Sequence, residues 1–260
     1  MEKTTGREAR ERIIEAAIEL FSKKGYDATR VSDIASAAHV NKALIYYYFK
    51  SKQDILDYMV DSLLNNAVSI ILDFIQTNIV QMVRNGYLDI KPDRLHFVND
   101  EAISVFMQNS YKYYERIVDF VIENKEIIRI LMLESLKNGK HQNSLFRFMK
   151  FMNDDNNNPI FKIISSADHD FVYSDEMVLF KFFFSIIPVV SFAAYFDDYK
   201  AVCSLSDDEL RSSFLNVYQI IATSLISGRD ILLRRNNSSK NLFYLSYGVK
   251  YKNSINQTVS

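Results

Sequence analysis

The chain has little of the residues that break helices or cross-link a fold. Its 260 residues include three prolines, six glycines and one cysteine, Cys203. So few prolines and glycines favour long helices over a turn-rich β fold. A single cysteine excludes an internal disulfide and suits a reducing cytoplasm, where an inert thiol is far more common than a redox-active one. We therefore expect a helical, cytoplasmic protein.

The usual signatures of catalysis and export are also missing. The sequence has no glycine-rich phosphate loop and no nucleophile elbow. Its histidines, His39, His96, His141 and His169, lie far apart, and the Asp-His-Asp triplet at 168–170 is a weak metal signal. The charged N-terminus has no apolar stretch with a cleavage site, so we expect no signal peptide. We predict no enzyme activity, no catalytic residues, no metal site and no cofactor.

Hydrophobic residues make up 48% of the chain, enough for a sizeable core. Residues 1–52 hold ten Lys or Arg against seven Asp or Glu, whereas the remainder holds 21 against 25. A basic N-terminal module on an acidic body suits nucleic-acid contact at one end, although ordinary surface scatter gives the same totals. The charges alone do not decide between these interpretations.

One stretch, Met177 to Phe196, approaches the length of a membrane span. Lys181, two serines and Pro188 interrupt it, and no basic cluster flanks it closely. We favour a buried interface helix and predict no membrane partner.

The stretch from Thr29 to Phe49 contains two short amphipathic segments around a tight turn. In the first, apolar residues recur with the spacing of one helix face. They are Val31, Ile34, Ala35 and Ala38. Thr29 is placed to cap this segment. The small alanines allow a close helix crossing.

The second segment begins after Asn41, which can cap it. His39 lies in the turn, where a left-handed backbone is typical and histidine is one of the better tolerated non-glycine residues. On the helix itself, one face carries apolar core residues and the other is basic and aromatic. The core face is Ile45, Tyr48 and Phe49, and the second face is Lys42, Ala43, Tyr46 and Tyr47, with Leu44 on its flank. This pattern indicates a helix-turn-helix that presents its second helix to DNA.

The same stretch resembles the TetR/AcrR family of transcriptional regulators, strongly over residues 7 to about 60 and elsewhere only in helical layout. The matching residues are Ile13 to Phe21, Gly25-Tyr26, Thr29, Val31, Asp33-Ile34-Ala35, Ala37-Ala38, Val40-Asn41-Lys42, Ile45-Tyr46-Tyr47, Phe49 and Lys52. The chain departs from the family pattern at His39, Asn41 and Tyr48, where Gly, Ser or Thr, and His are usual. The resemblance implies a three-helix DNA-binding domain joined to a larger helical ligand-binding and dimerisation domain.

Several side chains are candidate DNA contacts. Lys42 opens the second helix and could donate to guanine O6 or N7, although a solvated surface lysine is the alternative. Ala43 allows close approach, and its methyl group or Leu44 could touch a thymine methyl. The resemblance gives Tyr46 and Tyr47 phosphate contacts, although taken alone either tyrosine could be partly buried core. Thr29 and Lys52 begin their helices on the DNA side and are further candidates for phosphate contact.

We divide the chain into a DNA-binding domain at 1–52, a helical effector-binding and dimerisation domain at 53–235, and an unassigned polar tail at 236–260. Hydrophobic periodicity and capping signals predict the helices. They span about 7–24, 52–85, 93–123, 125–137, 144–153, 174–197 and 207–234, with a stop at Asn138-Gly139, a loop over 84–92 and an ambiguous segment at 160–165. The last helix carries a capping box, Ser206 with Glu209. The resemblance implies that the last two helices pair with a second copy as a homodimer.

The body is rich in methionine and aromatic residues. These are Met107, Tyr111, Tyr114, Met132, Phe148, Met152, Phe182 and Phe183. Aromatic stripes at helical spacing are usually core, but collectively such adaptable groups suit an apolar pocket between helices. The resemblance implies a small hydrophobic or aromatic effector there.

The sequence is thus interpreted as an all-α, homodimeric, ligand-responsive regulator that binds a palindromic DNA operator and represses transcription. The alternatives are a helical protein-interaction module that keeps the helix-turn-helix for packing, and an activator without a small-molecule effector. An enzyme that uses the body pocket is a third, with no catalytic constellation to support it.

Overall fold

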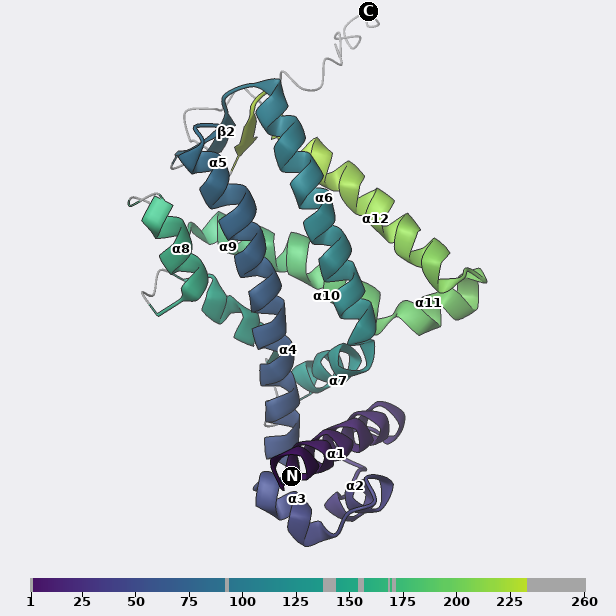
Figure 1. Ribbon diagram of the computed structural model, residues 1–260. Helices are drawn as coiled ribbons and strands as arrows, with labels where there is room; N and C mark the ends of the chain where they lie inside the picture. Colours follow the sequence, from purple (N-terminus) through teal and green to yellow (C-terminus); the bar gives the residue numbers. More distant parts are fainter. Residues whose placement is uncertain are drawn as a thin grey trace, which may run out of the picture.

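The computed structural model describes residues 2–91, 94–137, 144–153, 157–167, 169 and 172–232. Three helices form an N-terminal head, at the bottom of Figure 1: α1 (Glu2–Lys24), α2 (Val31–Ala37) and α3 (Lys42–Tyr48). Gly25 ends α1 with a φ of 85°, and its amide donates to the carbonyl of Phe21 at 3.0 Å. A left-handed glycine is a common way to end a helix.

One long helical segment connects the head to the body, as predicted. It comprises α4 (Lys52–Phe74), a π-helical turn η1 (Ile75–Val80) and α5 (Gln81–Arg84). The Ser51 hydroxyl caps α4 by accepting from the Asp54 amide at 3.1 Å. The segment rises from the head through the whole body (Figure 1). Its buried face includes Ile55, Leu56, Met59, Val60 and Leu63.

The remaining helices form the body. They are α6 (Asp100–Glu123), α7 (Lys125–Leu136), the 3-10 helix η2 (Ser144–Phe151), α8 (Pro159–Ala167), α9 (Asp175–Phe180), the π-helix η3 (Lys181–Ile186), α10 (Ile187–Ala194), α11 (Phe196–Cys203) and α12 (Asp207–Ser224). In Figure 1, α9 and α10 cross behind α4 and α6, and α12 lies beside α6. The predicted fold class, an N-terminal helix-turn-helix head on a larger helical body, is confirmed.

Several helices of the body differ in detail from the prediction. The segment predicted as one helix over 174–197 contains the π-helical turn η3, and α11 follows it unpredicted. The aromatic helix expected at 144–153 is a 3-10 helix, and the ambiguous segment at 160–165 lies in α8. The capping box of α12 is confirmed, because the Ser206 amide donates to Glu209 Oε2 at 2.8 Å and the Glu209 amide donates to Ser206 Oγ at 3.2 Å.

A small antiparallel sheet caps the end of the body farthest from the head, and the sequence did not predict it. Its strand order is β1-β2-β4-β3, with β1 (Leu88–Lys91), β2 (Arg94–Phe97), β3 (Ile226–Ser227) and β4 (Asp230–Leu232). The predicted loop at 84–92 is therefore partly strand, and α6 begins at Asp100 instead of about residue 93. Likewise α12 ends at Ser224 instead of about residue 234. Strands this short carry too few alternating residues to compete with a neighbouring helical pattern.

The largest buried cluster runs without interruption from the head into the body. It joins Ile13 and Ile34 of the head to Met59 of α4 and Leu131 of α7. Two smaller clusters lie around Phe97, near the sheet, and around Val80. The predicted boundary at residue 52 coincides with the start of α4, and the division into domains stays a prediction. The polar tail at 236–260 and the stop at Asn138-Gly139 lie outside the described residues.

Two helical stretches, Lys52–Arg84 and Asp175–Ala194, are long and apolar enough to cross a membrane by length and composition. This is weak support for a span, because the core helices of folded proteins pass the same test. In this structure Met177, Val189 and Val190 of the second stretch are buried against other helices.

Candidate nucleic-acid interface

The second helix of the helix-turn-helix, α3, is held by its inner face. Ile45 and Phe49 are buried, and the ring of Phe49 packs edge-on against Tyr58 of α4 with centroids 5.7 Å apart. The Arg10 guanidinium lies 4.0 Å from the Tyr58 ring centroid, a cation–π contact from α1. The Asn41 side chain caps α3 by accepting from the Leu44 amide at 2.8 Å, as predicted. Helices α1 and α4 therefore fix the direction in which α3 points.

The turn between α2 and α3 has the left-handed residue that the sequence predicted. His39 has a φ of 53°. The amide of Val40, the next residue, donates to the carbonyl of Ala35 at 3.0 Å, and Ala35 and Ala38 are both buried. The strained conformation at His39 thus allows the chain to reverse directly behind α2.

The outer face of α3 is open to solvent. Lys42 and Ala43 are exposed, as are Tyr46 and Tyr47, whose side chains are 55% and 78% exposed. Leu44 and Tyr48 are half-buried, and the rings of Tyr47 and Tyr48 meet edge-on with centroids 4.9 Å apart. The structure brings four of the seven predicted contact residues onto one accessible helix face, with Leu44 at its margin.

Thr29 is not on this face, and it does not cap α2. Its side chain is 1% exposed, and its hydroxyl donates to the carbonyl of Gly25 at 2.9 Å. The N-cap of α2 is Arg30, whose amide donates to the Asp33 carboxylate at 3.0 Å. The predicted cap was wrong by one residue, because the threonine hydroxyl closes the end of α1 instead. We therefore remove the Thr29 side chain from the set of DNA contacts.

Lys52 also has a different role from the one predicted. Its ammonium donates to the carbonyls of Tyr26 at 2.6 Å and Thr29 at 2.8 Å, and it lies 4.3 Å from the centroid of the Tyr26 ring. Burial raises the pKa of Tyr26 to about 12, with smaller contributions from nearby carboxylates. These contacts hold the loop between α1 and α2, so the ammonium is engaged inside the head and we also remove Lys52 from the set.

The head is tied to the body by ion pairs that sequence analysis missed. Lys137, which follows α7, donates to Asp27 of the head at 3.2 Å and to Glu134 at 2.5 Å. Arg147 of η2 pairs with Asp57 at 3.6 Å, and with Asp61 on the next turn of α4. Except for Glu134 and Lys137, which are three residues apart, these partners lie far apart along the chain, so no local pattern could have identified them. They place α7 and η2 against the head and the start of α4.

The predicted effector-pocket residues do not form one group. Met107, Tyr111 and Tyr114 line a cavity between α6 and α12. The other residues lie elsewhere: Met132, Phe148, Met152 and Phe182 pack in the main core, and Phe183 is exposed. The sequence could not separate these roles, because core and pocket residues share the same helical spacing. Among the described residues, no group of three or more His, Cys, Asp or Glu side chains could hold a metal ion.

The head is a helix-turn-helix domain, and it is mounted on a larger helical body. Residues 13–59 match the family described as bacterial regulatory proteins, tetR family. The chain is 41% identical over 76 residues to the biofilm operon icaADBC negative transcriptional regulator IcaR of Staphylococcus aureus, which is 29% of this chain and 36% of that protein. The IcaR protein of Staphylococcus epidermidis is 36% identical over 63 residues, covering 24% and 34%. The chain therefore matches only about a third of the length of these relatives.

A solved structure extends the likeness to the whole fold. A TetR-family regulator from Syntrophomonas wolfei is similar over 85% of this chain and 98% of its own, with 18% identity and a TM-score of 0.50. At this identity the likeness concerns the fold alone. The N-terminal residues 13–59 therefore match the tetR family, as the sequence predicted. The matched relatives are named as negative transcriptional regulators.

Proposed function

We propose that this protein is a cytoplasmic transcriptional repressor that binds a palindromic DNA operator as a homodimer and releases it when a small effector binds. The observation that carries the proposal is the outer face of α3, where Lys42, Ala43, Tyr46 and Tyr47 are all exposed on a helix fixed from behind. The name of the Staphylococcus aureus relative, a negative transcriptional regulator, supports repression over activation.

Each residue of this face has a chemistry suited to DNA. The Lys42 ammonium, in the first turn of α3, can donate to O6 and N7 of guanine. Ala43 and Leu44 present apolar atoms that suit a thymine methyl group. The hydroxyls of Tyr46 and Tyr47 can donate to phosphate oxygens, which position the helix without specifying sequence. Most of the affinity then comes from phosphate contacts and falls as salt rises.

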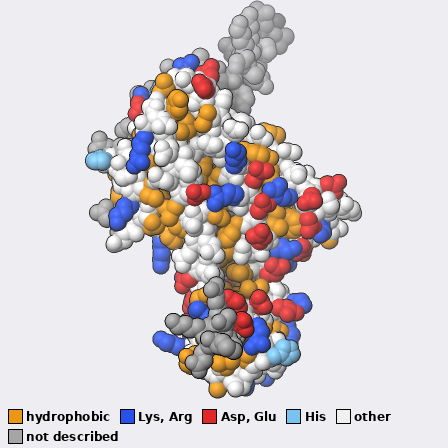
Figure 2. All heavy atoms as spheres, viewed as in Figure 1, with side chains coloured by type: hydrophobic (Ala, Val, Ile, Leu, Met, Phe, Trp, Pro, Cys, Tyr) orange, Lys and Arg blue, Asp and Glu red, His pale blue; other side chains and the backbone are white. Residues whose placement is uncertain are grey.

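Two exposed apolar stripes support dimerisation. The stripe on α12 and its C-cap consists of Val217, Ile220, Ile221 and Leu225. The stripe on α9 and η3 consists of Leu179, Phe180, Phe183 and Phe184. Figure 2 shows apolar side chains among charged ones of both signs over the face that carries α6 and α12. Stripes this extended suggest interaction sites. A two-fold dimer would place two α3 helices in successive major grooves, roughly 34–36 Å apart.

The proposed effector response needs a ligand site in the body, and the cavity between α6 and α12 is a candidate for it. The cavity between α6 and α12 encloses only about 10 Å³, about the space for one water molecule. An effector would therefore have to widen this region, and it acts on DNA binding only if it prefers one state of the dimer.

The proposal is tested by fluorescence anisotropy with labelled duplexes from the DNA upstream of the protein's own gene and from unrelated DNA of equal length. We expect wild type to prefer the upstream duplex and to lose affinity as salt rises. Lys42→Ala combined with Tyr46→Ala should remove the preference, whereas Lys112→Ala on the exposed surface of α6 should not. Equal binding of both duplexes by wild type and the double variant would count against α3 as the reading helix at this DNA.

A further inference from the structure

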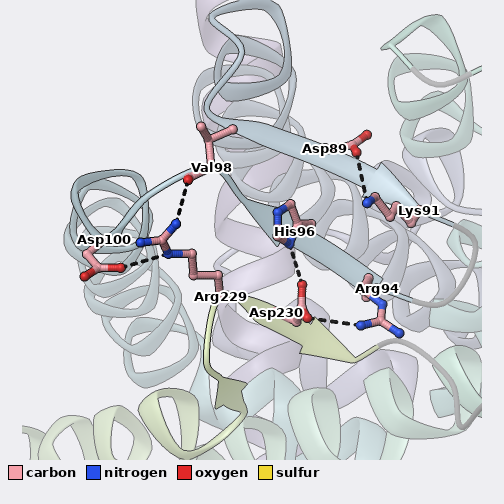
Figure 3. Close-up of polar contacts among 8 residues, drawn as sticks. All are labelled: Asp89, Lys91, Arg94, His96, Val98, Asp100, Arg229 and Asp230. Atoms are coloured by element: carbon pink, nitrogen blue, oxygen red, sulfur yellow. Dashed lines mark hydrogen bonds and ion pairs between the residues drawn. The ribbon is translucent and has the colours of Figure 1, made fainter.

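Helices α6 and α12 lie side by side and are fixed to each other at both ends (Figure 1). Near the start of α12, the guanidinium of Arg211 donates to both carboxylate oxygens of Asp119, at 2.5 and 2.9 Å. After the end of α12, Arg229 donates to Asp100, the first residue of α6, and to the carbonyl of Val98, each at 3.1 Å (Figure 3). Between these two attachments the helices enclose a cavity.

The lining of this cavity includes a buried polar atom. Ser110 of α6 is 4% exposed, and its hydroxyl has no hydrogen-bond partner among the residues that the structure describes. This is unusual within the helix, because a serine commonly donates to the carbonyl four residues earlier. Ser104, also on α6, does so, donating to Asp100 at 3.0 Å. An unpaired buried hydroxyl is costly, so a group that pairs with Ser110 would bind with a gain in free energy.

The other lining side chains define what can reach Ser110. They are Met107, Tyr111, Tyr114, Leu215, Gln219 and Ala222, and none of them is charged. Leu215 is fully buried and Tyr114 packs edge-on against Tyr218 at 4.2 Å, so these two form a fixed floor. Gln219 is exposed, and Met107 and Tyr111 are half-buried, so these three form a rim that can rearrange.

The dimensions limit the size of an occupant. The enclosed part is about 10 Å³, and the groove opens from it to solvent. Sites for drug-sized ligands span roughly 300–1,000 Å³, so this groove suits something smaller. An ion is disfavoured because, within the described part of the chain, no charged side chain lines the groove to balance it.

We propose that the groove between α6 and α12 binds a small, neutral, mainly apolar molecule that carries one hydroxyl or carbonyl oxygen, and that this oxygen pairs with the Ser110 hydroxyl. A simple phenol has these properties. The inference rests on the proposed ligand-responsive function and gives it a site and a ligand class. Because α12 also carries one of the exposed apolar stripes, a molecule wedged beside it would shift that stripe relative to α6.

The test compares phenol with toluene, which has a methyl group in place of the hydroxyl. Each is titrated into the full-length protein without DNA while the NMR signal of the Met107 methyl group is followed. We expect saturable binding of phenol that is tighter than that of toluene. Ser110→Ala should weaken the binding of phenol by about fivefold or more, since one net hydrogen bond is lost. The same variant should leave the affinity for toluene unchanged. Ser104→Ala is the matched control and should change neither.

Equal affinity for phenol and toluene, or unchanged phenol affinity in Ser110→Ala, would overturn the proposal, as would no response of Met107 up to the solubility of phenol. Thermal unfolding of Ser110→Ala checks its fold, and we expect no loss of stability because the variant removes an unpaired hydroxyl. The DNA measurement is separate. If phenol binds as predicted but leaves DNA affinity unchanged, the site stands and the proposed effector response through it fails.

Discussion

At the scale of single residues, the head depends on side chains that hold backbone in place. His39 maintains a left-handed conformation at the turn before α3, which costs free energy for any residue with a Cβ. Lys52 holds two carbonyls of the loop before α2, and Asn41 caps α3. These contacts set the position of the exposed face of α3, although none of the three side chains belongs to that face.

Replacing the strained residue in this turn tests its cost directly. We expect His39→Gly to raise the free energy of unfolding by about 0.5–1 kcal/mol, because glycine adopts positive φ without steric penalty. The measurement is chemical denaturation followed by circular dichroism. Ser36→Gly, in the last turn of α2 with an ordinary helical backbone, is the control and should lower stability by roughly 0.5 kcal/mol. A loss of stability in both variants would show that the His39 side chain contributes more than its backbone strain costs.

Much of this residue-level arrangement could be predicted from the sequence, because caps and turn residues act locally. Asn41 and His39 both behave as their positions predicted. Thr29 and Lys52 do not, because their partners are backbone carbonyls of a loop whose path depends on tertiary packing. A position at the start of a helix was therefore a poor guide to whether a side chain faces DNA.

At the scale of elements, the small sheet connects two parts of the chain that are far apart in sequence. Strand β2 pairs with β4, so His96 lies opposite Asp230 and Arg94 lies opposite Leu232. The Asp230 carboxylate lies 2.7 Å from Nδ1 of His96 and 3.1 Å from the guanidinium of Arg94 (Figure 3). The hydrogen bond to His96 is the largest contribution that lowers the pKa of Asp230 below 3.8, and Arg94 adds to it. The sheet thereby attaches the end of α12 to the start of α6.

This cluster predicts a specific dependence of stability on pH. A lowered pKa in the folded state means that the Asp230 carboxylate stabilises the protein above pH 3.8 and loses this effect as pH falls through the lowered value. Asp230→Asn should therefore be less stable than wild type near neutral pH, and the difference should shrink in acid. Urea denaturation across pH measures it.

The control for this measurement lies in the same sheet. Asp89, an exposed carboxylate on β1, lies 3.5 Å from Lys91. We expect Asp89→Asn to change stability by at most ~1 kcal/mol, as is typical of surface pairs. If Asp230→Asn were as stable as wild type near neutral pH, the cluster would not be what holds β4 to β2.

The elements themselves were predictable where a long apolar stripe or a capping box identified them, as in α4 and α12. The sheet was not predictable, because β2 and β4 are separated by more than 130 residues and each is too short to show alternation. The π-helical turns η1 and η3 were missed for a similar reason, since one inserted residue leaves the apolar pattern almost unchanged.

At the scale of the whole molecule, the exposed apolar stripe on α12 is part of the proposed dimer interface. The exposed stripe on α12 predicts that Ile220→Asp, at a side chain 65% exposed, yields a monomer at concentrations where wild type is a dimer. A charge placed in an apolar interface loses hydration without a partner, which disfavours association. Analytical ultracentrifugation gives the mass, and circular dichroism checks that the fold is kept.

The matched control introduces the same charge at an exposed apolar residue away from both stripes. Leu136 at the end of α7 is 83% exposed, and Leu136→Asp should leave the mass unchanged. If wild type and both variants had the mass of a monomer, the homodimer would be excluded and with it the palindromic operator.

The most direct test of the central claim is selection of bound fragments from a random duplex DNA library by the full-length protein. The account predicts enrichment of an inverted repeat whose half-sites lie about one helical turn apart, bound at least ~10³-fold more tightly than unrelated DNA. The variant carrying Lys42→Ala and Tyr46→Ala should enrich no such sequence although it folds like wild type. If folded wild-type protein enriched no sequence at all, the exposed face of α3 would not read DNA, and the proposed function would be contradicted.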